Sequence, residues 1–432
     1  MINLDLIREN PEKIKDAIAK KGISLDFDKL LKLDSDRRVL IQEIDEMRAQ
    51  QKQFNTKIAA LSDKDKEQSL SDMKIVAQDL KQKEKELGEV ETLWQELILL
   101  LPNFPSDDTP VGKSDKDNVE VEKWGEPRKF DFKPKDHLAL GEDLDLFDLE
   151  RGAKTSGFRG YYLKNEAAIL HFAILFWAFK KIVEKGFAPM LSPTILKEFA
   201  LIGSGHFPFG KDDIYELANT GKDEAGKHIG EPLYLSGTSE PSLLAYFSDE
   251  ILEEKDLPKK VCGFSQCYRN EVGSYGKDMR GLYRIHEFMK VEQVILCAAD
   301  EKESEKYLRQ MKEYSQELLR ELGLPHRVVQ VCTGDMGAGK RKMYDIETYM
   351  PSRGYCETHS DSDLTDWQSR RLNIKYKTQA GKKVYAYALN NTVLASPRIL
   401  IALLENYQNS DGSVTIPKVL VPYTGFDRIE GK

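Results

Sequence analysis

Charged and aromatic side chains alternate in two neighbouring segments of the chain. We expect each segment to form a β-strand, at Val261–Asn270 and Leu282–Leu296, with the glycine-containing connection Val272–Gly281 as a hairpin loop. Because alternate residues of a strand point to the same face, one face of this hairpin should carry two guanidinium groups, one aromatic ring and two carboxylates. These groups belong to Arg269, Glu271, Arg284, Phe288 and Glu292.

Such a density of charge is costly to bury unless a ligand pairs with it. Guanidinium groups suit phosphate oxygens, a flat ring suits a nucleobase, and carboxylates suit an amine, a hydroxyl or a metal ion. A nucleotide together with an amine-bearing substrate would satisfy the whole set. An exposed sheet face with internal salt bridges fits the same periodicity, so the pattern alone leaves both interpretations open.

Two further segments carry weaker signals. Gly334–Lys340 fits the first part of a phosphate-binding P-loop, but the next residue is Arg341 instead of the serine or threonine that would bind magnesium. Met343–Tyr349 then alternates like a strand where a helix should follow, so we expect no phosphate site there. The spacing of Cys262 and Cys267 is a weak metal signal, and buried strand cysteines are the simpler interpretation.

The composition predicts a soluble globular protein, because 40% of the residues are hydrophobic and 31% are charged. The formal charge of −8 argues against indiscriminate coating of nucleic acid, although a local basic patch could still bind RNA. The five cysteines fit a reducing compartment, and the start of the chain lacks the features of a signal peptide. The most apolar run, Ala167–Phe179, is too short to span a bilayer. We therefore expect a cytoplasmic protein with no membrane partner.

Two heptad patterns near the start of the chain predict a helical hairpin, about 33–101. The polar turn Ser62–Asp65 separates them, and each helix would be roughly 40 Å long. A dimerisation coil and an RNA-binding arm both fit this pattern. The charge does not decide between them, because acidic residues slightly outnumber basic ones and no basic stripe is present. Earlier in the chain, Asn10 and Pro11 predict a helix start. The two seams consist of Leu33, Arg37, Leu40, Ile44, Met47, Gln51, Phe54, Ile58 and Leu61, and of Leu70, Met73, Ala77, Leu80, Glu84, Leu87, Glu91, Trp94, Ile98 and Leu101.

The rest of the chain has a mixed pattern. Ser106–Asn118 is polar and rich in turn residues, and we expect it to be a linker. Beyond it, short strand-like runs alternate with predicted helices at Ala167–Lys185 and Lys302–Glu321. This mixture predicts an α+β fold in which helices flank an antiparallel sheet.

Phe264–Gln293 (FSQCYRNEVGSYGKDMRGLYRIHEFMKVEQ) resembles motif 2 of the class II aminoacyl-tRNA synthetases, and within them that of the seryl-tRNA synthetases of bacterial type. The resemblance covers nearly the whole chain. It implies an N-terminal tRNA-binding domain at 1–104 and a class II catalytic domain at 105–432. The helical hairpin resembles the family's tRNA-binding arm, and Asp136–Leu170 resembles the segment that leads into the catalytic domain. Gly186–Pro193 resembles the dimer-forming motif 1, with its proline at Pro193. Thr238–Glu240 resembles the serine-binding loop, and Arg398–Tyr407 resembles motif 3.

The resemblance implies the activity of a serine–tRNA ligase. Serine would attack the α-phosphorus of ATP, with Mg²⁺ assisting, to give seryl-adenylate and pyrophosphate. The terminal ribose of tRNA(Ser) would then take the seryl group, and many members of the family also charge tRNA(Sec). Motif 1 implies a homodimer. Neither step needs a covalent nucleophile on the protein, because positioning and charge neutralisation supply most of the acceleration.

The resemblance also implies roles for individual residues. Arg269 would bind the α-phosphate, Arg284 and Arg398 the outer phosphates, and Phe288 the adenine ring. The catalytic set would be Arg269, Glu271, Arg284 and Arg398. The ATP site would consist of Arg269, Asn270, Glu271, Arg284, Phe288, Glu357, Thr358, His359, Ser360 and Arg398, with Glu357 and Ser360 as metal ligands. The serine site would consist of Thr238, Ser239, Glu240, Arg269, Glu292 and Thr392.

Several positions depart from the commoner family pattern. Glu287 replaces a glutamine beside the adenine position, Cys356–Ser360 (CETHS) replaces a more basic stretch, Ser396-Pro397 replaces Val-Gly, and Thr392 replaces a serine. His359 fits either a polar contact in the site or a hydrogen-bonded structural histidine. Two other functions remain compatible with a synthetase-like core: loading an amino acid onto a carrier protein, and a regulatory role without catalysis. The helical arm disfavours the first, and the retained charged residues disfavour the second.

Overall fold

The computed structural model describes residues 2–57, 63–221, 224, 226, 230–272 and 281–431. The chain divides into two compact units, which we call the helical unit (Asn3–Pro102) and the sheet unit (Met1–Ile2 together with Asn103–Lys432). None of the helices within these described ranges is long and apolar enough to cross a membrane.

The helical unit begins with two short helices and continues into two long ones. Helix α1 spans Leu4–Glu9, α2 spans Pro11–Lys20, α3 spans Phe27–Lys57 and α4 spans Asp63–Ile98. The predicted helix start at Asn10 is confirmed, because its side chain accepts a hydrogen bond from the backbone nitrogen of Lys13 at 3.2 Å.

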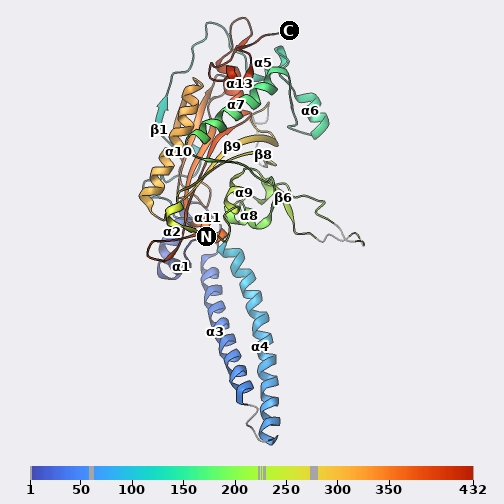
Figure 1. The fold of residues 1–432 in the computed structure, drawn as a ribbon, viewed down its shortest axis with the longest axis vertical. Helices are drawn as coiled ribbons and strands as arrows, with labels where there is room; N and C mark the ends of the chain where they lie inside the picture. The colour runs from blue at the N-terminus through green and yellow to red at the C-terminus, as the bar shows by residue number, and fades with distance from the viewer. Residues whose placement is uncertain are drawn as a thin grey trace. The chain divides into compact units, whose positions relative to one another are not determined.

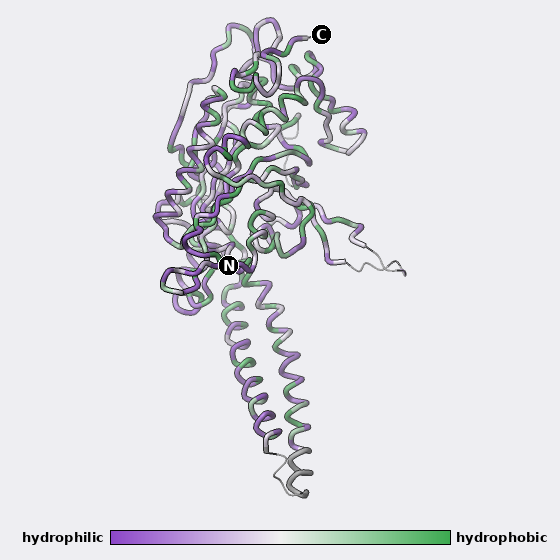
Figure 2. Tube along the Cα trace, in the orientation of Figure 1, coloured by the Kyte–Doolittle hydropathy of each residue, from purple (hydrophilic) through white to green (hydrophobic). Residues whose placement is uncertain are grey.

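Helices α3 and α4 form the predicted antiparallel pair, and both mix hydrophilic and hydrophobic residues along their length (Figure 2). Ion pairs join Arg37 to Glu91 at 3.0 Å and Arg48 to Glu84 at 2.8 Å, so residue numbers rise along one helix as they fall along the other. The predicted first seam is buried or half-buried at every position from Leu33 to Phe54.

Two details of the predicted hairpin are wrong. Ala77 and Glu84 of the second seam are exposed, and the Glu84 carboxylate pairs with Arg48 of α3. The predicted turn Ser62–Asp65 is helical from Asp63 onward, since α4 begins there. Ile58, Leu61 and Ser62 lie outside the described residues.

The sheet unit is built on an eight-stranded sheet (Figure 1). Neighbouring strands are antiparallel, apart from the parallel pair β4 and β8. This arrangement confirms the predicted α+β class with a mainly antiparallel sheet. In spatial order the strands are β1 (Val119–Trp124), β10 (His326–Gln330), β11 (Lys342–Met350), β12 (Gly354–Thr365), β15 (Tyr387–Ala395), β9 (Glu287–Cys297), β8 (Lys259–Tyr268) and β4 (Ala188–Leu191).

Helices and short strands complete the sheet unit. Helices α7, α10 and α12 pack on the large sheet around one apolar core, and a second apolar cluster lies between the sheet and helices α9 and α11. The helices are α5 (His137–Asp143), α6 (Leu149–Ser156), α7 (Asn165–Glu184), α8 (Glu198–Ser204), α9 (Glu240–Ala245), α10 (Glu301–Glu321), α11 (Trp367–Leu372), α12 (Arg398–Asn406) and α13 (Val421–Thr424). The short strands are β2 (Phe147–Asp148), β3 (Tyr162–Leu163), β5 (Ile195–Lys197), β6 (Leu233–Leu235), β7 (Ile251–Glu253), β13 (Lys375–Lys377), β14 (Lys383–Tyr385), β16 (Val414–Thr415) and β17 (Arg428–Ile429).

The predicted helices at Ala167–Lys185 and Lys302–Glu321 are confirmed by α7 and α10. The strand predicted at Met343–Tyr349 is also confirmed, as β11. Because a strand and not a helix follows Gly334–Lys340, this segment lacks the helix N-terminus that a P-loop needs.

The predicted strand at Leu282–Leu296 is wrong over its first five residues, because β9 begins at Glu287. The backbone nitrogen of Leu282 bonds to the side chain of His137 instead of a neighbouring strand. Of the predicted hairpin loop, residues 273–280 lie outside the described part of the chain.

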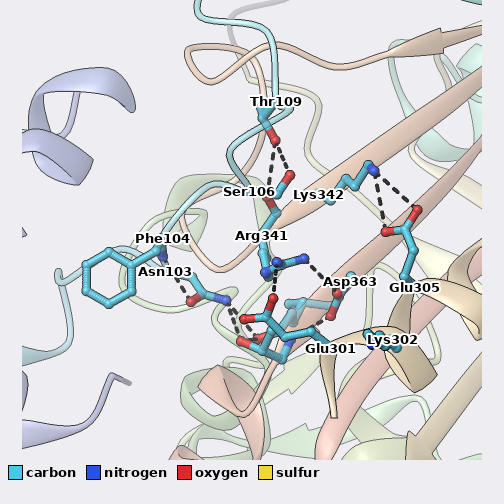
Figure 3. Close-up of polar contacts among 12 residues, drawn as sticks. Asn103, Phe104, Ser106, Thr109, Glu301, Lys302, Glu305, Arg341, Lys342 and Asp363 are labelled. Carbon is cyan, nitrogen blue, oxygen red and sulfur yellow. Dashed lines mark hydrogen bonds and ion pairs between the residues drawn. The ribbon is translucent and has the colours of Figure 1, made fainter. Parts of the chain in front are cut away.

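The predicted linker Ser106–Asn118 is part of the sheet unit and packs against it. The backbone nitrogen of Ser106 donates to Arg341, and Lys342 on β11 pairs with Asp108 at 2.6 Å and with Glu305 on α10 at 3.2 Å. Just before it, the amide of Asn103 donates to three acceptors near the start of β11 and the end of β12 (Figure 3). Polarity predicted a solvated segment here, but the polar side chains bond to the protein.

Candidate active site

A cavity of about 270 Å³ opens where the ends of β8 and β9 meet β12, β15 and the start of α12. It brings together nine of the residues predicted for the site, from segments that are far apart in the sequence. The cavity is not lined by the other six predicted residues, Thr238, Ser239, Glu240, Asn270, Glu292 and Ser360. The nine predicted lining residues are Arg269, Glu271, Arg284, Phe288, Glu357, Thr358, His359, Thr392 and Arg398.

Arg269 and Phe288 form one wall of this cavity. The strand pairing places Phe288 opposite Cys267, and the guanidinium carbon of Arg269 lies 5.4 Å from the centre of the Phe288 ring. The Nε atom of Arg269 also donates to the carbonyl of Gly237 at 3.2 Å. The guanidinium is therefore held beside a flat ring, which is the arrangement expected for a phosphate next to a nucleobase.

Arg284 and Glu271 face each other across the same cavity. The Nη1 atom of Arg284 lies 3.0 Å from Oε2 of Glu271, which has a positive φ of 53° just beyond the end of β8. The predicted strand position of Arg284 is wrong, since this residue precedes β9. The predicted strand Val261–Asn270 also ends too late, because β8 stops at Tyr268 and leaves Arg269 and Glu271 beyond it. Arg284 nevertheless reaches the cavity, because the backbone nitrogen of Arg269 bonds to His286 and holds the two chain segments together.

Arg398 completes the cluster of three arginines. Its Nη1 atom lies 2.8 Å from the carbonyl oxygen of Glu357 and 3.2 Å from the Oε2 atom, and its guanidinium carbon lies 4.5 Å from the centre of the Tyr283 ring. Burial works against the charged guanidinium, but Glu357, Tyr283 and Glu271 together outweigh burial and raise the pKa of Arg398. This arginine is therefore a fixed positive charge at the cavity wall.

A buried polar group lies next to the cavity on β9 and β15. Glu292 is the cross-strand partner of Thr392, and its carboxylate forms a buried ion pair with Lys290. Lys290 also lies 3.4 Å from the hydroxyl of Thr392. Burial raises the pKa of Glu292 in spite of the adjacent ammonium group. The pair can present a carboxylate and an ammonium group to a small amphoteric ligand.

The segment Thr238–Glu240 is buried close to this pair. Gly263 lies opposite Glu292 on β8, and a side chain at Gly263 would clash with the hydroxyl of Ser239 at 2.7 Å. The glycine therefore makes room for the buried loop. Gln368 donates to the Glu240 carboxylate at 2.6 Å. Burial opposes ionisation of Glu240, but nearby positive charge, Lys340 foremost, lowers its pKa.

Glu357 and Ser360, both on β12, carry oxygen atoms that could bind a metal ion, and Glu357 contacts Arg398. Asp345 is the cross-strand partner of Ser360 and is hydrogen-bonded to it. Burial, followed by the proximity of Glu357, raises the pKa of Asp345 well above its ordinary value. Within the described ranges, the side chains form no group of three or more metal-binding residues. A divalent ion held by Glu357 and Ser360 would thus need oxygens from a ligand to complete its coordination.

His359 has the environment of a structural histidine. Its Nδ1 atom lies 2.8 Å from the hydroxyl of Thr358, which lies 2.6 Å from the hydroxyl of Thr348. Burial, followed by the charge of His326, lowers the pKa of His359 to about 3, so its ring is neutral. Of the two roles open to His359, the structure favours the structural one.

The unusual Glu287 is exposed, and Gln266 donates to its carboxylate at 2.7 Å. The five cysteines are free, and Cys262 and Cys267 are buried strand residues as expected. Burial raises the pKa of both thiols, which disfavours the thiolate that a metal would need.

Several residues that line the cavity were not predicted from the sequence, among them Lys290, Tyr283 and Asp213. Lys290 shares a face of β9 with Phe288 and Glu292, so the same parity rule could have found it. Tyr283 and Asp213 also line the cavity. Neither gave a local signal, because Tyr283 precedes the strand and Asp213 comes from a distant short helix, Lys211–Asp213.

Comparisons with known proteins agree with this arrangement. Residues 1–105 match the family model for the seryl-tRNA synthetase N-terminal domain, and residues 224–407 match the class II tRNA synthetase core domain (G, H, P, S and T). Serine–tRNA ligase from Deinococcus radiodurans is 42% identical over all of this chain and 99% of its own length, and that from Borreliella afzelii is 41% identical over the full length of both.

Solved structures give the same result. Seryl-tRNA synthetase from Pyrococcus horikoshii, solved in complex with ATP, superposes with a TM-score of 0.89 at 36% identity over the full length of both chains. The cytoplasmic serine–tRNA ligase of Naegleria fowleri, in complex with AMP, superposes with a TM-score of 0.84 at 27% identity. The resemblance read from the sequence is confirmed over the full length of the chain, which belongs to the serine–tRNA ligase family of class II aminoacyl-tRNA synthetases.

Proposed function

We propose that this protein activates L-serine with ATP and transfers the seryl group to tRNA(Ser). The observation that carries the proposal is the convergence of three arginines and an aromatic ring on one cavity, with a buried carboxylate–ammonium pair beside it. The arginines fit a triphosphate, the ring fits adenine, and the buried pair fits the amine and hydroxyl of serine.

For the nucleotide, we assign Arg269 to the α-phosphate and Arg284 and Arg398 to the outer phosphates. We assign Phe288 to stacking on adenine, with the guanidinium group of Arg269 close to its ring. Glu271 orients Arg284 through their 3.0 Å ion pair, and Thr358 and His359 line the wall of the ATP site, next to which we also assign Asn270.

For serine, we assign the buried residues that adjoin the cavity. Glu292 and Glu240 accept hydrogen bonds from the amine or hydroxyl of serine, and Thr392 offers its hydroxyl beside Glu292. Thr238 and Ser239 close the pocket from the segment before α9. Alanine would leave these buried polar groups unpaired, so the pocket should reject it far more strongly than a difference in size alone would allow.

The chemistry follows from these positions. Arg269 neutralises the charge that grows on the α-phosphate as the serine carboxylate attacks, and Arg284 and Arg398 stabilise the departing pyrophosphate. Glu357 and Ser360 would hold Mg²⁺ together with phosphate oxygens, and the ion would add Lewis-acid neutralisation of phosphate charge. Their oxygen donors fit such an ion. A covalent nucleophile on the protein is not required.

For the second step, we assign residues 1–104 to tRNA binding, with the hairpin of α3 and α4 as the arm that reaches the tRNA. tRNA(Sec) is a candidate second acceptor, and charging of a tRNA(Sec) transcript tests it. Loading of a carrier protein is the alternative second step, and the arm is the feature that disfavours it.

We also propose that the protein is a homodimer. Ile169, Phe172 and Phe176 form an exposed apolar stripe on α7, and Leu191 at the end of β4 is 81% exposed. A stripe of large apolar side chains on one helix, together with an exposed edge strand, is typical of a subunit interface.

The activation step is tested by amino-acid-dependent exchange of pyrophosphate into ATP, run with each of the twenty amino acids. Serine should support exchange and alanine should not. Exchange with another amino acid and none with serine would contradict the proposal.

A further inference from the structure

A buried carboxylate on α12 joins two distant segments of the sheet unit. Glu405 is 0% exposed, and its Oε1 accepts bonds from the backbone nitrogen of His137 at 2.9 Å, from His137 Nδ1 at 3.1 Å and from the hydroxyl of Ser352 at 2.8 Å. Its Oε2 accepts from the backbone nitrogen of Ser352 at 2.9 Å. Four donors satisfy the buried charge and fix the orientation of the His137 ring.

The other ring nitrogen of His137 points to a different part of the chain. The backbone nitrogen of Leu282 donates to His137 Nε2 at 3.3 Å. A donor facing Nε2 and a carboxylate facing Nδ1 define a neutral ring with its proton on Nδ1. His137 therefore links a helix residue, Glu405, to the segment that returns toward β9.

The contact between this segment and His137 is close. Gly281 has a φ of +75°, and a Cβ at this position would lie 2.2 Å from His137 Nε2. Only glycine adopts this backbone conformation readily and leaves room for the ring. The sequence thus allows Leu282 to reach its acceptor.

The residues after Leu282 belong to the cavity. The Tyr283 ring lies 4.3 Å from the guanidinium carbon of Arg353 and 4.5 Å from that of Arg398, and its carbonyl accepts from Arg398 Nε at 3.4 Å. Arg284 then pairs with Glu271. Two of the three cavity arginines therefore depend on where the backbone from Leu282 to Arg284 lies.

We propose that His137 is a positioning residue for ATP. Held by Glu405, it fixes the backbone at Leu282 and thereby places Arg284 and Arg398 for the outer phosphates. This inference rests on the function proposed above, because those two arginines have the assigned roles only if ATP binds in this cavity.

Two amide replacements of His137 separate its two bonds. In H137N, the amide nitrogen takes the place of Nδ1 and keeps the bond to Glu405, but nothing reaches Leu282. In H137Q, the longer side chain places its amide oxygen near the position of Nε2, where it can accept from Leu282. We expect H137N to raise KM for ATP about tenfold in serine-dependent exchange, as for one lost buried hydrogen bond, with KM for serine within about twofold of wild type. H137Q should restore KM for ATP.

Ser352→Ala is the matched control, because it removes one bond to the same carboxylate without touching Leu282, and it should leave KM for ATP near the wild-type value. G281A disturbs the same contact, because its Cβ would displace Leu282 from His137 Nε2. If H137N fails to fold, a rise in KM for ATP in G281A with unchanged KM for serine supports the proposal.

Wild-type kinetics in H137N would overturn the positioning role of His137. Parallel rises in KM for ATP and KM for serine, or wild-type kinetics in G281A, would overturn it as well. A failure of H137Q to restore KM for ATP would overturn it too. If the unaltered protein shows no serine-dependent exchange, the proposed function fails instead, so the two failures are distinguishable.

Discussion

Replacing Lys290 with methionine would test the buried ion pair next to the cavity. The side chains of Lys290 and Glu292 are 6% and 3% exposed, so the substitution leaves a carboxylate in the interior without its counter-ion. Methionine is chosen because it fills a similar volume and adds no polar group.

The expected loss of stability follows from this burial. Removing one partner of a buried ion pair typically costs about 3–5 kcal/mol. Burial already raises the pKa of Glu292 while Lys290 is present, and without the ammonium group the pKa should rise further. Below the pKa of the unfolded chain the carboxyl is neutral in both states, so the penalty is absent there. The penalty grows as pH rises above the pKa of the unfolded chain, because the unfolded carboxyl then ionises while the buried one stays protonated, and it reaches its full value once pH exceeds the native pKa.

The measurement is the free energy of unfolding in urea at pH 5.5 and pH 8 for the wild type, K290M, and K290M/E292Q. The free energy of unfolding of K290M should fall by several kcal/mol at pH 8 and by distinctly less at pH 5.5. The two losses should differ by about 1.4 kcal/mol for each pH unit in this range over which the unfolded carboxyl is ionised and the native one is protonated. The double variant should recover most of the loss and have little pH dependence. A loss in K290M that is equal at both pH values, or a double variant as unstable as the single one, would show that the Glu292 carboxylate is not destabilised by the loss of its ion pair.

Three further changes test other parts of the structure. R269A should lower serine-dependent exchange about 10²–10³-fold by removing charge stabilisation at the α-phosphate, and exchange at the wild-type rate would contradict the role of this residue. N103A should lower the free energy of unfolding in urea by about 2–3 kcal/mol, because it leaves the carbonyls of residues 339 and 364 and the Thr365 hydroxyl without the amide donor; an unchanged value would show that these bonds contribute nothing. Replacing residues 33–101 with a short flexible linker should spare exchange but abolish serylation of tRNA, whereas loss of both would mean that the catalytic fold needs the arm.

The fold was predictable where the pattern is local. Seam residues such as Leu40 and Ile44 lie on one side of α3 because heptad spacing maps directly onto a helix. Phe288 and Glu292 share a face of β9 for a similar reason, since side chains alternate along a strand. Periodicity needs no knowledge of distant contacts, so these predictions succeed.

The same argument fails where distant contacts decide the backbone. Arg284 was predicted to lie on a strand, but the segment containing it bonds to His137, which lies far away in the sequence. Asp108 was placed in a free linker, although Lys342 holds it on the sheet unit. In both cases the partner belongs to another element, and no local period reveals it.

The composition of the site was only partly accessible from residue patterns. Parity correctly placed Phe288 and Glu292 on one face of β9, whereas Glu357 and Arg398 entered through the resemblance to a family. Their proximity depends on the order β12–β15–β9 in the sheet. The sequence pattern predicts that such a sheet exists but does not determine this order.

Serylation of tRNA is the most direct test of the central claim. The full-length protein is incubated with ATP, Mg²⁺, labelled serine and a tRNA(Ser) transcript, and label that co-precipitates with the tRNA is counted. We expect attachment of serine that depends on ATP and on the terminal ribose, and that is absent with a transcript for another amino acid. Serine-dependent exchange without any transfer to tRNA(Ser), or transfer to a carrier protein in its place, would contradict it.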